Sequence, residues 1–141
     1  TVTDTCSFFT GKAKFKFLHP DKSYHPLNEN NASLVCRLDT KKESFLFTGD
    51  IEADAENYLV DNYAQELKAD FLKIPHHGSR SSSSSEFLQA VNPQEVWITA
   101  SRRNSYHFPH PETIKRLQKQ QCQILLTGNG TIRKMIDSRS N

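Results

Sequence analysis

The stretch SFLFTGDIEADAENYLVDNYAQELKADFLKIPHHGS, residues 44–79, decides the fold. It opens with a short β-type run that stops at Gly49 and Asp50. Beyond Asp50 the spacing becomes helical, because apolar residues recur at steps of four: Ile51, Ala55, Leu59, Tyr63 and Leu67. Residues 70–75 are again β-type and end at Pro75. The order strand, helix, strand predicts an α/β layered domain.

The residues before this stretch indicate further strands. Residues 12–18 alternate apolar and basic side chains with a period of two, which is typical of a half-buried strand. Residues 32–38 and 44–48 are two β-type runs joined by a charged connection that resembles a turn. We therefore expect these two runs to form a hairpin.

The residues after this stretch alternate between helix and strand. Ser83 lies three positions before Glu86 and ahead of an apolar run, which is the spacing of a capping box at a helix start. Pro111 stands at the first position of a helix expected over residues 111–120. We expect strands at residues 95–99, 123–126 and 131–136, with a turn at 128–130 between the last two.

Composition and charge bound the functions that are possible. The chain has 141 residues, the size of one domain, and no apolar run approaches the ~20 residues that cross a bilayer. Residues 1–72 carry 8 Lys and Arg against 12 Asp and Glu, a net charge of −4. Residues 73–141 carry 10 against 4, a net charge of +6. The second part is therefore the one suited to binding phosphate groups.

The three cysteines, Cys6, Cys36 and Cys122, are widely separated and include no Cys-x-x-Cys pair, which excludes a zinc knuckle made of thiolates. A disulfide between Cys6 and Cys36 stays open. Isolated thiols that serve as small apolar residues are the favoured interpretation.

Asp50 is the first candidate for chemistry, because it follows a strand and a glycine and so projects from a strand end. A carboxylate in that place could bridge two metal ions. On the Gly-Asp pair alone, however, a cap for the helix that begins at Ile51 is favoured.

His76 and His77 are adjacent, so their imidazoles should diverge and take different partners. One can offer a nitrogen to zinc or a similar ion while the other faces a substrate phosphate. Gly78 and Ser79 follow them and supply backbone N–H groups and a hydroxyl that could donate to phosphate oxygens. His19 and His25 are interpreted as structural or solvated.

The polar aromatic loop over residues 100–110 holds the remaining candidates. Arg102 and Arg103 lie in it beside Asn104, where a phosphate-binding role explains them better than solvation does. His110 precedes the helix at Pro111, a position that suits a fixed imidazole and a simple helix start equally. Nucleotide-binding loops, dinucleotide turns and the serine-hydrolase elbow are absent from the sequence, which leaves metal-assisted hydrolysis among enzyme classes.

Five motifs resemble, in order, the closing half of the metallo-β-lactamase-like domain of ComEC-type DNA internalisation proteins. They are residues 31–35 (NASLV), 45–52 (FLFTGDIE), 73–79 (KIPHHGS), 104–111 (NSYHFPHP) and 127–130 (TGNG). The resemblance covers nearly the whole chain. It implies that residues 1–141 are the C-terminal part of an αβ/βα sandwich, with a mixed sheet and flanking helices.

The resemblance also implies roles for site residues. Asp50 looks like the metal-bridging aspartate, and His76 like the histidine that completes the second metal position. His77 matches a catalytic position, while Ser79, Asn104 and His110 match positions that bind substrate or support the site. At residue 108, where relatives can place histidine, this chain has Phe108.

The metal-binding signature His-x-His-x-Asp-His of this superfamily does not occur in the 141 residues. In the family it lies upstream, so the chain looks like a fragment that holds half of a metal site. We expect zinc or manganese in the intact domain, no tight metal binding by the fragment, and no activity of the fragment alone.

The expected function is therefore that of a DNA uptake protein whose domain acts as a metal-dependent phosphodiesterase or nuclease during internalisation. One alternative is a non-catalytic module that binds DNA or associates with the channel. A second alternative is another hydrolase of the metallo-β-lactamase fold. The expected partners are DNA, the membrane channel portion of the parent chain and a second copy of the fragment. The resemblance places the parent in the bacterial inner membrane, with this domain outside the cytoplasm.

Overall fold

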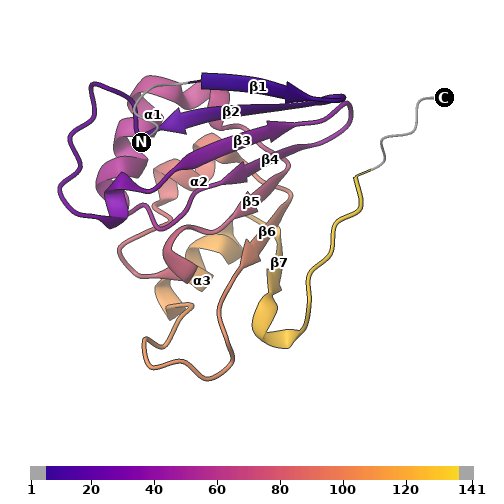
Figure 1. Ribbon diagram of the computed structural model, residues 1–141. Helices are drawn as coiled ribbons and strands as arrows, with labels where there is room; N and C mark the ends of the chain where they lie inside the picture. The colour runs from indigo at the N-terminus through magenta and orange to yellow at the C-terminus, as the bar shows by residue number, and fades with distance from the viewer. Residues whose placement is uncertain (1–5, 137–141) are drawn as a thin grey trace.

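A computed structural model describes residues 6–136 as one seven-stranded mixed sheet with three α-helices (Figure 1). The strands lie in the sheet in chain order: β1 (Cys6–Thr10), β2 (Ala13–His19), β3 (Val35–Asp39), β4 (Ser44–Phe47), β5 (Phe71–Lys73), β6 (Glu95–Ile98) and β7 (Gln123–Leu126). The helices are α1 (Ala53–Leu67), α2 (Ser85–Val91) and α3 (Pro111–Lys119). Short 3₁₀ turns lie at Asn30–Ala32, Pro75–Gly78 and Thr127–Asn129. The predicted α/β class is confirmed.

The sheet changes character at β4. Strands β1 to β4 pair antiparallel, which includes the predicted hairpin of β3 and β4. From β4 to β7 the pairing is parallel, and each crossover is made by one of the three helices. The carboxyl ends of β4, β5 and β6 therefore meet at one edge of the sheet.

The main core lies between the sheet and the three helices, which cover one face (Figure 1). Alternate strand residues point into it, and Leu46, Leu72 and Val96 are fully buried there. They meet apolar residues of the helices such as Leu59 and Phe87. Among the described residues, no helix is long and apolar enough to cross a membrane.

The opposite face of the sheet carries an aromatic layer. Phe45 and Phe71 stack with ring centroids 4.7 Å apart, and Trp97 packs beside both rings. Residues 131–136 pass along this face, where the Lys134 ammonium lies 4.0 Å from the centroid of the Phe71 ring and pairs with Glu43 at 2.9 Å. The prediction of a strand at 131–136 is therefore wrong. The alternate residues of this segment, Ile132, Lys134 and Ile136, lie against the aromatic face. The segment does not pair with β7.

The starts of the first two helices differ from the predictions. Helix α1 begins at Ala53 after Glu52, so Asp50 is not its cap. Helix α2 is capped by Ser84, whose hydroxyl accepts from the Phe87 N–H at 3.2 Å, one residue later than predicted. The reason is the buried carboxylate of Glu56, which accepts the backbone N–H groups of both Ser83 and Ser84 and fixes the chain before the helix.

Strand β1 was not predicted, and it bears on the disulfide between Cys6 and Cys36. Phe17 of β2 pairs with Cys6 on one side and with Cys36 on the other. Two strand spacings of about 4.8 Å separate the two cysteines, which is too far for the Cα separation of a disulfide. All three cysteines are free thiols, as the favoured interpretation held, and Cys122 packs against the core as a small apolar residue, whereas Cys6 is exposed.

His19 is structural, as predicted, and makes folding stability depend on pH. Its imidazole is 1% exposed and its Nε2 lies 2.8 Å from the carbonyl oxygen of Asn31. Burial lowers the pKa of His19 below its ordinary value of 6.5, although the Asn31 carbonyl and the carboxylates of Asp21 and Asp54 act in the opposite direction. The unfolded chain therefore binds this proton more readily than the folded chain does.

We expect the free energy of unfolding to fall as the pH decreases below 6.5, by at most about 1.4 kcal/mol per pH unit from this one proton. Well above pH 6.5 the residue is neutral in both states and contributes no slope. Urea unfolding at pH 7.5 and 5.5 measures the effect, and His19→Gln should reduce the difference. The exposed His25 supplies the control, because His25→Gln should leave the difference unchanged. An equal pH dependence in all three proteins would reject the role of His19.

Candidate functional site

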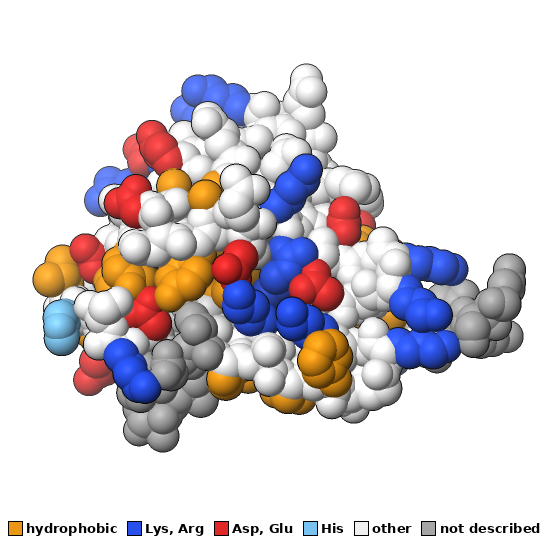
Figure 2. Space-filling model, turned by 90° about the horizontal axis from the view of Figure 1, so that it is seen from above, with side chains coloured by type: hydrophobic (Ala, Val, Ile, Leu, Met, Phe, Trp, Pro, Cys, Tyr) orange, Lys and Arg blue, Asp and Glu red, His pale blue; other side chains and the backbone are white. Residues whose placement is uncertain are grey.

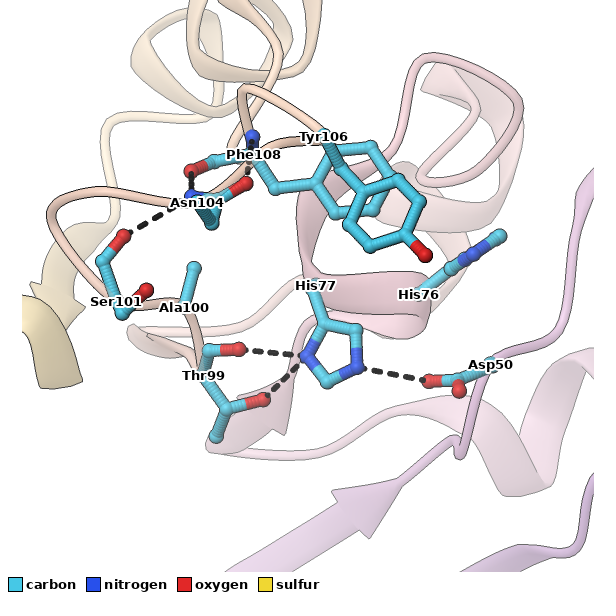
Figure 3. Close-up of a pocket in the computed structure, with 9 residues that line it drawn as sticks. All are labelled: Asp50, His76, His77, Thr99, Ala100, Ser101, Asn104, Tyr106 and Phe108. Atoms are coloured by element: carbon cyan, nitrogen blue, oxygen red, sulfur yellow. Dashed lines mark hydrogen bonds and ion pairs between the residues drawn. The ribbon is translucent and has the colours of Figure 1, made fainter.

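A pocket of about 400 Å³ lies at the edge where the parallel strands end (Figure 3). It is lined by residues from the segments that follow β4, β5 and β6: Asp50, His76, His77, Thr99, Ala100, Ser101, Asn104, Tyr106 and Phe108. The parallel register brings these segments together, since β4 pairs with β5 and β5 pairs with β6. The predicted candidates Asp50, His76, His77 and Asn104 therefore share one pocket.

Asp50 is placed by the tight turn before it. Gly49 adopts a φ of +55°, and a Cβ atom there would lie 2.7 Å from the Cβ of Ser33. The Ser33 hydroxyl accepts the backbone N–H of Asp50 at 3.1 Å. These contacts hold the carboxylate at the strand end, where its side chain is 41% exposed and one oxygen lies 3.7 Å from Nε2 of His77.

His77 is oriented by Thr99. Its Nδ1 lies 2.5 Å from the Thr99 carbonyl oxygen and 3.1 Å from the Thr99 hydroxyl. Because a carbonyl oxygen can only accept, Nδ1 carries a proton, and Nε2 is the ring nitrogen on the side of Asp50 (Figure 3). A histidine that ligates a metal through one ring nitrogen typically donates a hydrogen bond from the other ring nitrogen, often to a backbone carbonyl.

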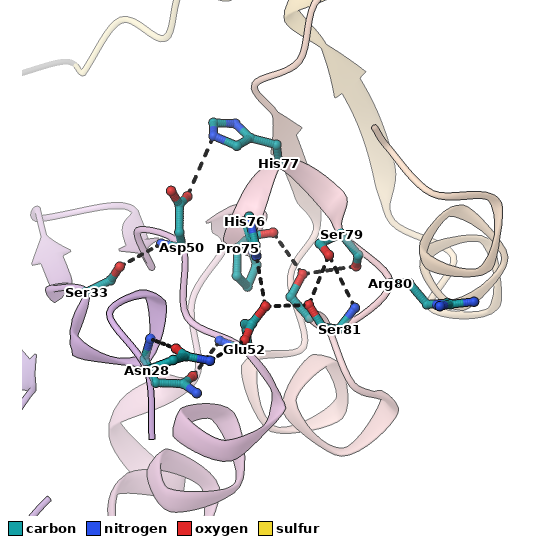
Figure 4. Close-up of polar contacts among 12 residues, drawn as sticks. Asn28, Ser33, Asp50, Glu52, Pro75, His76, His77, Ser79, Arg80 and Ser81 are labelled. Atoms are coloured by element: carbon teal, nitrogen blue, oxygen red, sulfur yellow. Dashed lines mark hydrogen bonds and ion pairs between the residues drawn. The ribbon is translucent and has the colours of Figure 1, made fainter. Parts of the chain in front are cut away.

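His76 takes a different partner, as predicted for adjacent imidazoles. Its Nδ1 lies 3.2 Å from a Glu52 oxygen, a contact of the ion-pair kind and not a hydrogen bond. Figure 4 shows the Glu52 carboxylate at the centre of this group, where it also accepts from Ser81 at 2.7 Å and from Asn28 at 2.8 Å. Burial alone would raise the pKa of Glu52, but these hydrogen bonds and the nearby His76 lower it. Glu52 therefore stays ionised beside His76.

The backbone of this turn is strained. His76 and His77 have φ values of +45° and +54°, a region that residues other than glycine rarely occupy. The His76 N–H donates to the Gly49 carbonyl at 3.2 Å, which ties this turn to the segment that carries Asp50. Such strain costs about 1–3 kcal/mol per residue and clusters at functional sites.

Lys73 adds a cation close to Asp50. Its ammonium donates to the carbonyl oxygens of Gly49 at 3.2 Å and Ile74 at 3.0 Å. Burial lowers the pKa of Lys73, while the charge of Asp50 acts to raise it.

Four residues at the site were not predicted from the sequence: Glu52, Lys73, Thr99 and Tyr106. Glu52, Lys73 and Tyr106 lie inside the quoted motifs. Their position within a motif, and not their residue type, could therefore have identified them.

The other predicted residues lie around the pocket. The Asn104 amide donates to the carbonyls of Ser101 at 3.0 Å and Phe108 at 2.8 Å and accepts the Phe108 N–H at 2.9 Å, so it braces its own loop. Ser79 is buried in the turn after Gly78, where its hydroxyl contacts that of Ser81.

His110 starts α3, where its Nδ1 accepts the Glu112 N–H at 3.3 Å, and it does not line the pocket. Arg102 and Arg103 are exposed and line an adjoining hollow that shares Asn104 and Phe108 with the first pocket.

The donors at the pocket, a carboxylate and imidazole nitrogens, are of the kind that zinc and manganese accept. Within residues 6–136, no three or more His, Cys, Asp or Glu side chains are arranged to hold a metal ion. Asp50 and the Nε2 of His77 are the pair that faces one another, whereas His76 was the predicted partner of Asp50. The residues present therefore fit part of a metal site, since catalytic zinc usually takes three protein ligands.

Comparison with known proteins places the chain among competence proteins, although no protein-family model matches it. It is 37% identical over 127 residues to ComE operon protein 3 of Bacillus subtilis (strain 168), an alignment of 89% of this chain and 16% of that protein. It is 32% identical over 113 residues to competence protein ComA of Neisseria gonorrhoeae, covering 80% of this chain and 16% of that protein. It is also 42% identical over 98 residues to the uncharacterized protein YcaI of Escherichia coli (strain K12), covering 70% and 13%. The chain thus spans less than a fifth of the length of these relatives. On these alignments, the chain belongs to the ComEC family of competence proteins.

Proposed function

We propose that this chain is the closing half of a metallo-β-lactamase-type domain, and that the domain is a metal-dependent phosphodiesterase or nuclease that acts on DNA during uptake. The observation that carries the proposal is the meeting of Asp50, His76 and His77 at one pocket, from the ends of two neighbouring strands. Family membership supports DNA as the substrate, because named relatives are competence proteins.

Each residue has a role that follows from its contacts. Asp50 offers carboxylate oxygens, and His77, whose Nδ1 is bonded to Thr99, offers its other ring nitrogen, Nε2. Glu52 holds His76 in the same pocket. A zinc or manganese ion bound among these donors would lower the pKa of a bound water and so supply hydroxide near neutral pH. The remaining ligands would come from residues outside this chain.

The contacts to DNA in this proposal are made by the loop after β6. Arg102 and Arg103 are exposed beside the pocket and can contact phosphate groups. The guanidinium of Arg102 is positioned by the Asn129 side chain, which accepts from its Nε at 3.2 Å. The backbone of the substrate would thus pass over this loop on its way to Asp50.

The rest of the domain would pack on the aromatic face of the sheet. Three helices cover the opposite face, whereas on the aromatic face residues 131–136 line a hollow together with Phe45 and Trp97. A second sheet layer on the aromatic face would complete an αβ/βα sandwich. We further propose that the longer protein lies in the bacterial inner membrane, with this domain outside the cytoplasm and beside the channel portion.

The test is hydrolysis of labelled DNA by the full-length protein with manganese, zinc or EDTA. Cleavage that requires the metal supports the proposal. Cleavage of a small phosphodiester without cleavage of DNA would indicate another hydrolase of the same fold.

A second candidate is a module that binds DNA without cutting it. The observation in its favour is that the described part of the chain brings together fewer than three metal ligands. This candidate requires a DNA affinity that falls steeply with salt, together with intact DNA after incubation with every divalent metal tested.

The chain on its own should also self-associate. Strand β1 is an edge strand, and all five of its residues are exposed, including Phe9 at 72%. Seen from above, on the side of β1, hydrophobic side chains lie next to a group of Lys and Arg side chains (Figure 2). Light scattering should detect a mass above that of the monomer at high concentration, and Phe9→Lys should reduce it. A monomer at every concentration would contradict this prediction.

A further inference from the structure

Tyr106 is an exposed aromatic residue held at the pocket that contains Asp50 and His77. Its side chain is 75% exposed although it lines that pocket. One face of its ring lies against Phe108, with centroids 5.6 Å apart and planes 18° apart. The Phe108 ring is in turn 20° from the plane of the His77 imidazole, at 6.5 Å. Three nearly parallel rings therefore lead from solvent to the imidazole that faces Asp50 (Figure 3).

The loop that carries Tyr106 is held in place by hydrogen bonds. The Asn104 side chain makes three hydrogen bonds within the loop, and the His107 N–H donates to the Asn104 carbonyl at 3.2 Å. At its end, the His110 N–H donates to the Gly78 carbonyl at 2.8 Å. The Tyr106 ring is thus presented by a preformed loop, so a ligand that stacks on it meets a surface already in position.

The charge of the same loop suits a polyanion. Residues 99–110 contain Arg102 and Arg103 and no Asp or Glu. Both arginines are exposed and line the hollow next to Tyr106. An exposed aromatic ring beside basic side chains is the combination with which proteins bind single-stranded nucleic acid, because the bases stack on the ring while the cations follow the backbone.

We propose that Tyr106 stacks on an unpaired base of a single-stranded nucleic acid and thereby places the adjoining phosphodiester beside Asp50 and His77. The placement of the phosphodiester rests on the proposed function, whereas the stacking does not. In a duplex the bases stack on one another, and exposing one costs a few kcal/mol. The loop therefore selects single strands over duplexes.

The experiment measures binding by the full-length protein in EDTA, so that its result does not depend on hydrolysis. The probes are labelled 20-nucleotide strands of deoxythymidine and of uridine, a 20-residue abasic strand with the same backbone, and a 20-base-pair duplex. Tyr106→Ala should weaken binding of the two base-bearing strands by about 5- to 150-fold, the range measured when one stacking aromatic is lost. It should leave the abasic strand within about twofold, whereas Tyr106→Phe should bind all probes as the unchanged protein does.

Arg103→Ala serves as the matched control, because it should weaken binding of the abasic and base-bearing strands alike and reduce the slope of affinity against salt. Equal losses on base-bearing and abasic strands in Tyr106→Ala would overturn the proposal, as would no loss on either. If Tyr106→Ala alters the circular dichroism of the protein, Tyr106→Leu takes its place and is compared with Tyr106→Phe. Weaker binding of only the base-bearing strands by Tyr106→Leu supports the proposal, and equal binding by the two variants overturns it. Stacking without metal-dependent cleavage would support the role of Tyr106 and reject the proposed nuclease function. Cleavage without stacking would support the nuclease function and reject the role of Tyr106.

Discussion

Asp50→Asn should lower the proposed metal-dependent cleavage of DNA by the full-length protein by more than about 100-fold, since loss of a residue that merely supports a ligand already costs 10–100-fold. The amide keeps the size of the side chain but loses the charge and one oxygen acceptor that can face a cation. The fold should be retained, because the contact that places residue 50 is made by its backbone N–H with Ser33.

The matched control for this variant is Asp61→Asn, which removes an exposed carboxylate from α1 outside the pocket. It should cleave DNA at the rate of the unchanged protein. His77→Asn should resemble Asp50→Asn, whereas His25→Gln should have no effect. Undiminished cleavage by a folded Asp50→Asn protein would remove Asp50 from the proposed site.

Gly78→Ala should lower the free energy of unfolding by about 2 kcal/mol or more, because strain at a positive φ and overpacking each cost about 1–3 kcal/mol. Gly78 has a φ of +84°, and a Cβ atom there would lie 2.7 Å from the Cβ and 3.2 Å from the Cα of Pro109. The second of these atoms belongs to the backbone and cannot move aside alone. The loop that carries Phe108 would have to shift.

Gly11→Ala is the control for Gly78→Ala. Gly11 also has a positive φ, +57°, but no atom lies within 4 Å of the position of an added Cβ. It should therefore cost only the backbone strain, about 1–2 kcal/mol. Urea unfolding of both variants measures the difference. Equal losses would show that the close approach of Pro109 to residue 78 adds no steric cost.

Local patterns predicted most of the elements near the site. The steps of four from Ile51 to Leu67 gave helix α1, and the β-type runs gave β4, β5 and β6, because side-chain period is a property of neighbouring residues. The prediction that the adjacent imidazoles of His76 and His77 diverge is confirmed by their separate partners, Glu52 and Thr99.

Contacts between distant residues account for what the sequence did not predict. Ser84 and not Ser83 caps α2, because Glu56, 27 and 28 residues away, takes the two backbone N–H groups. Residues 131–136 have the period of a strand but lie on the aromatic face, where Lys134 finds Phe71 and Glu43. Asp50 lies beside His77 and not at a helix N-cap, because Ser33 and Gly49 fix the turn before it. None of these partners is marked by local spacing.

The residues of the site are divided among the segments that follow three different strands, and this division has an evolutionary consequence. Asp50 and His77 follow β4 and β5 directly, while Arg102, Arg103 and Tyr106 lie on the loop after β6. If the loop binds the substrate as proposed, insertions or substitutions in it would change which nucleic acid is bound without moving the carboxylate and the imidazole. In the proposed function, substrate preference and the metal-binding pair Asp50 and His77 can therefore change independently of one another.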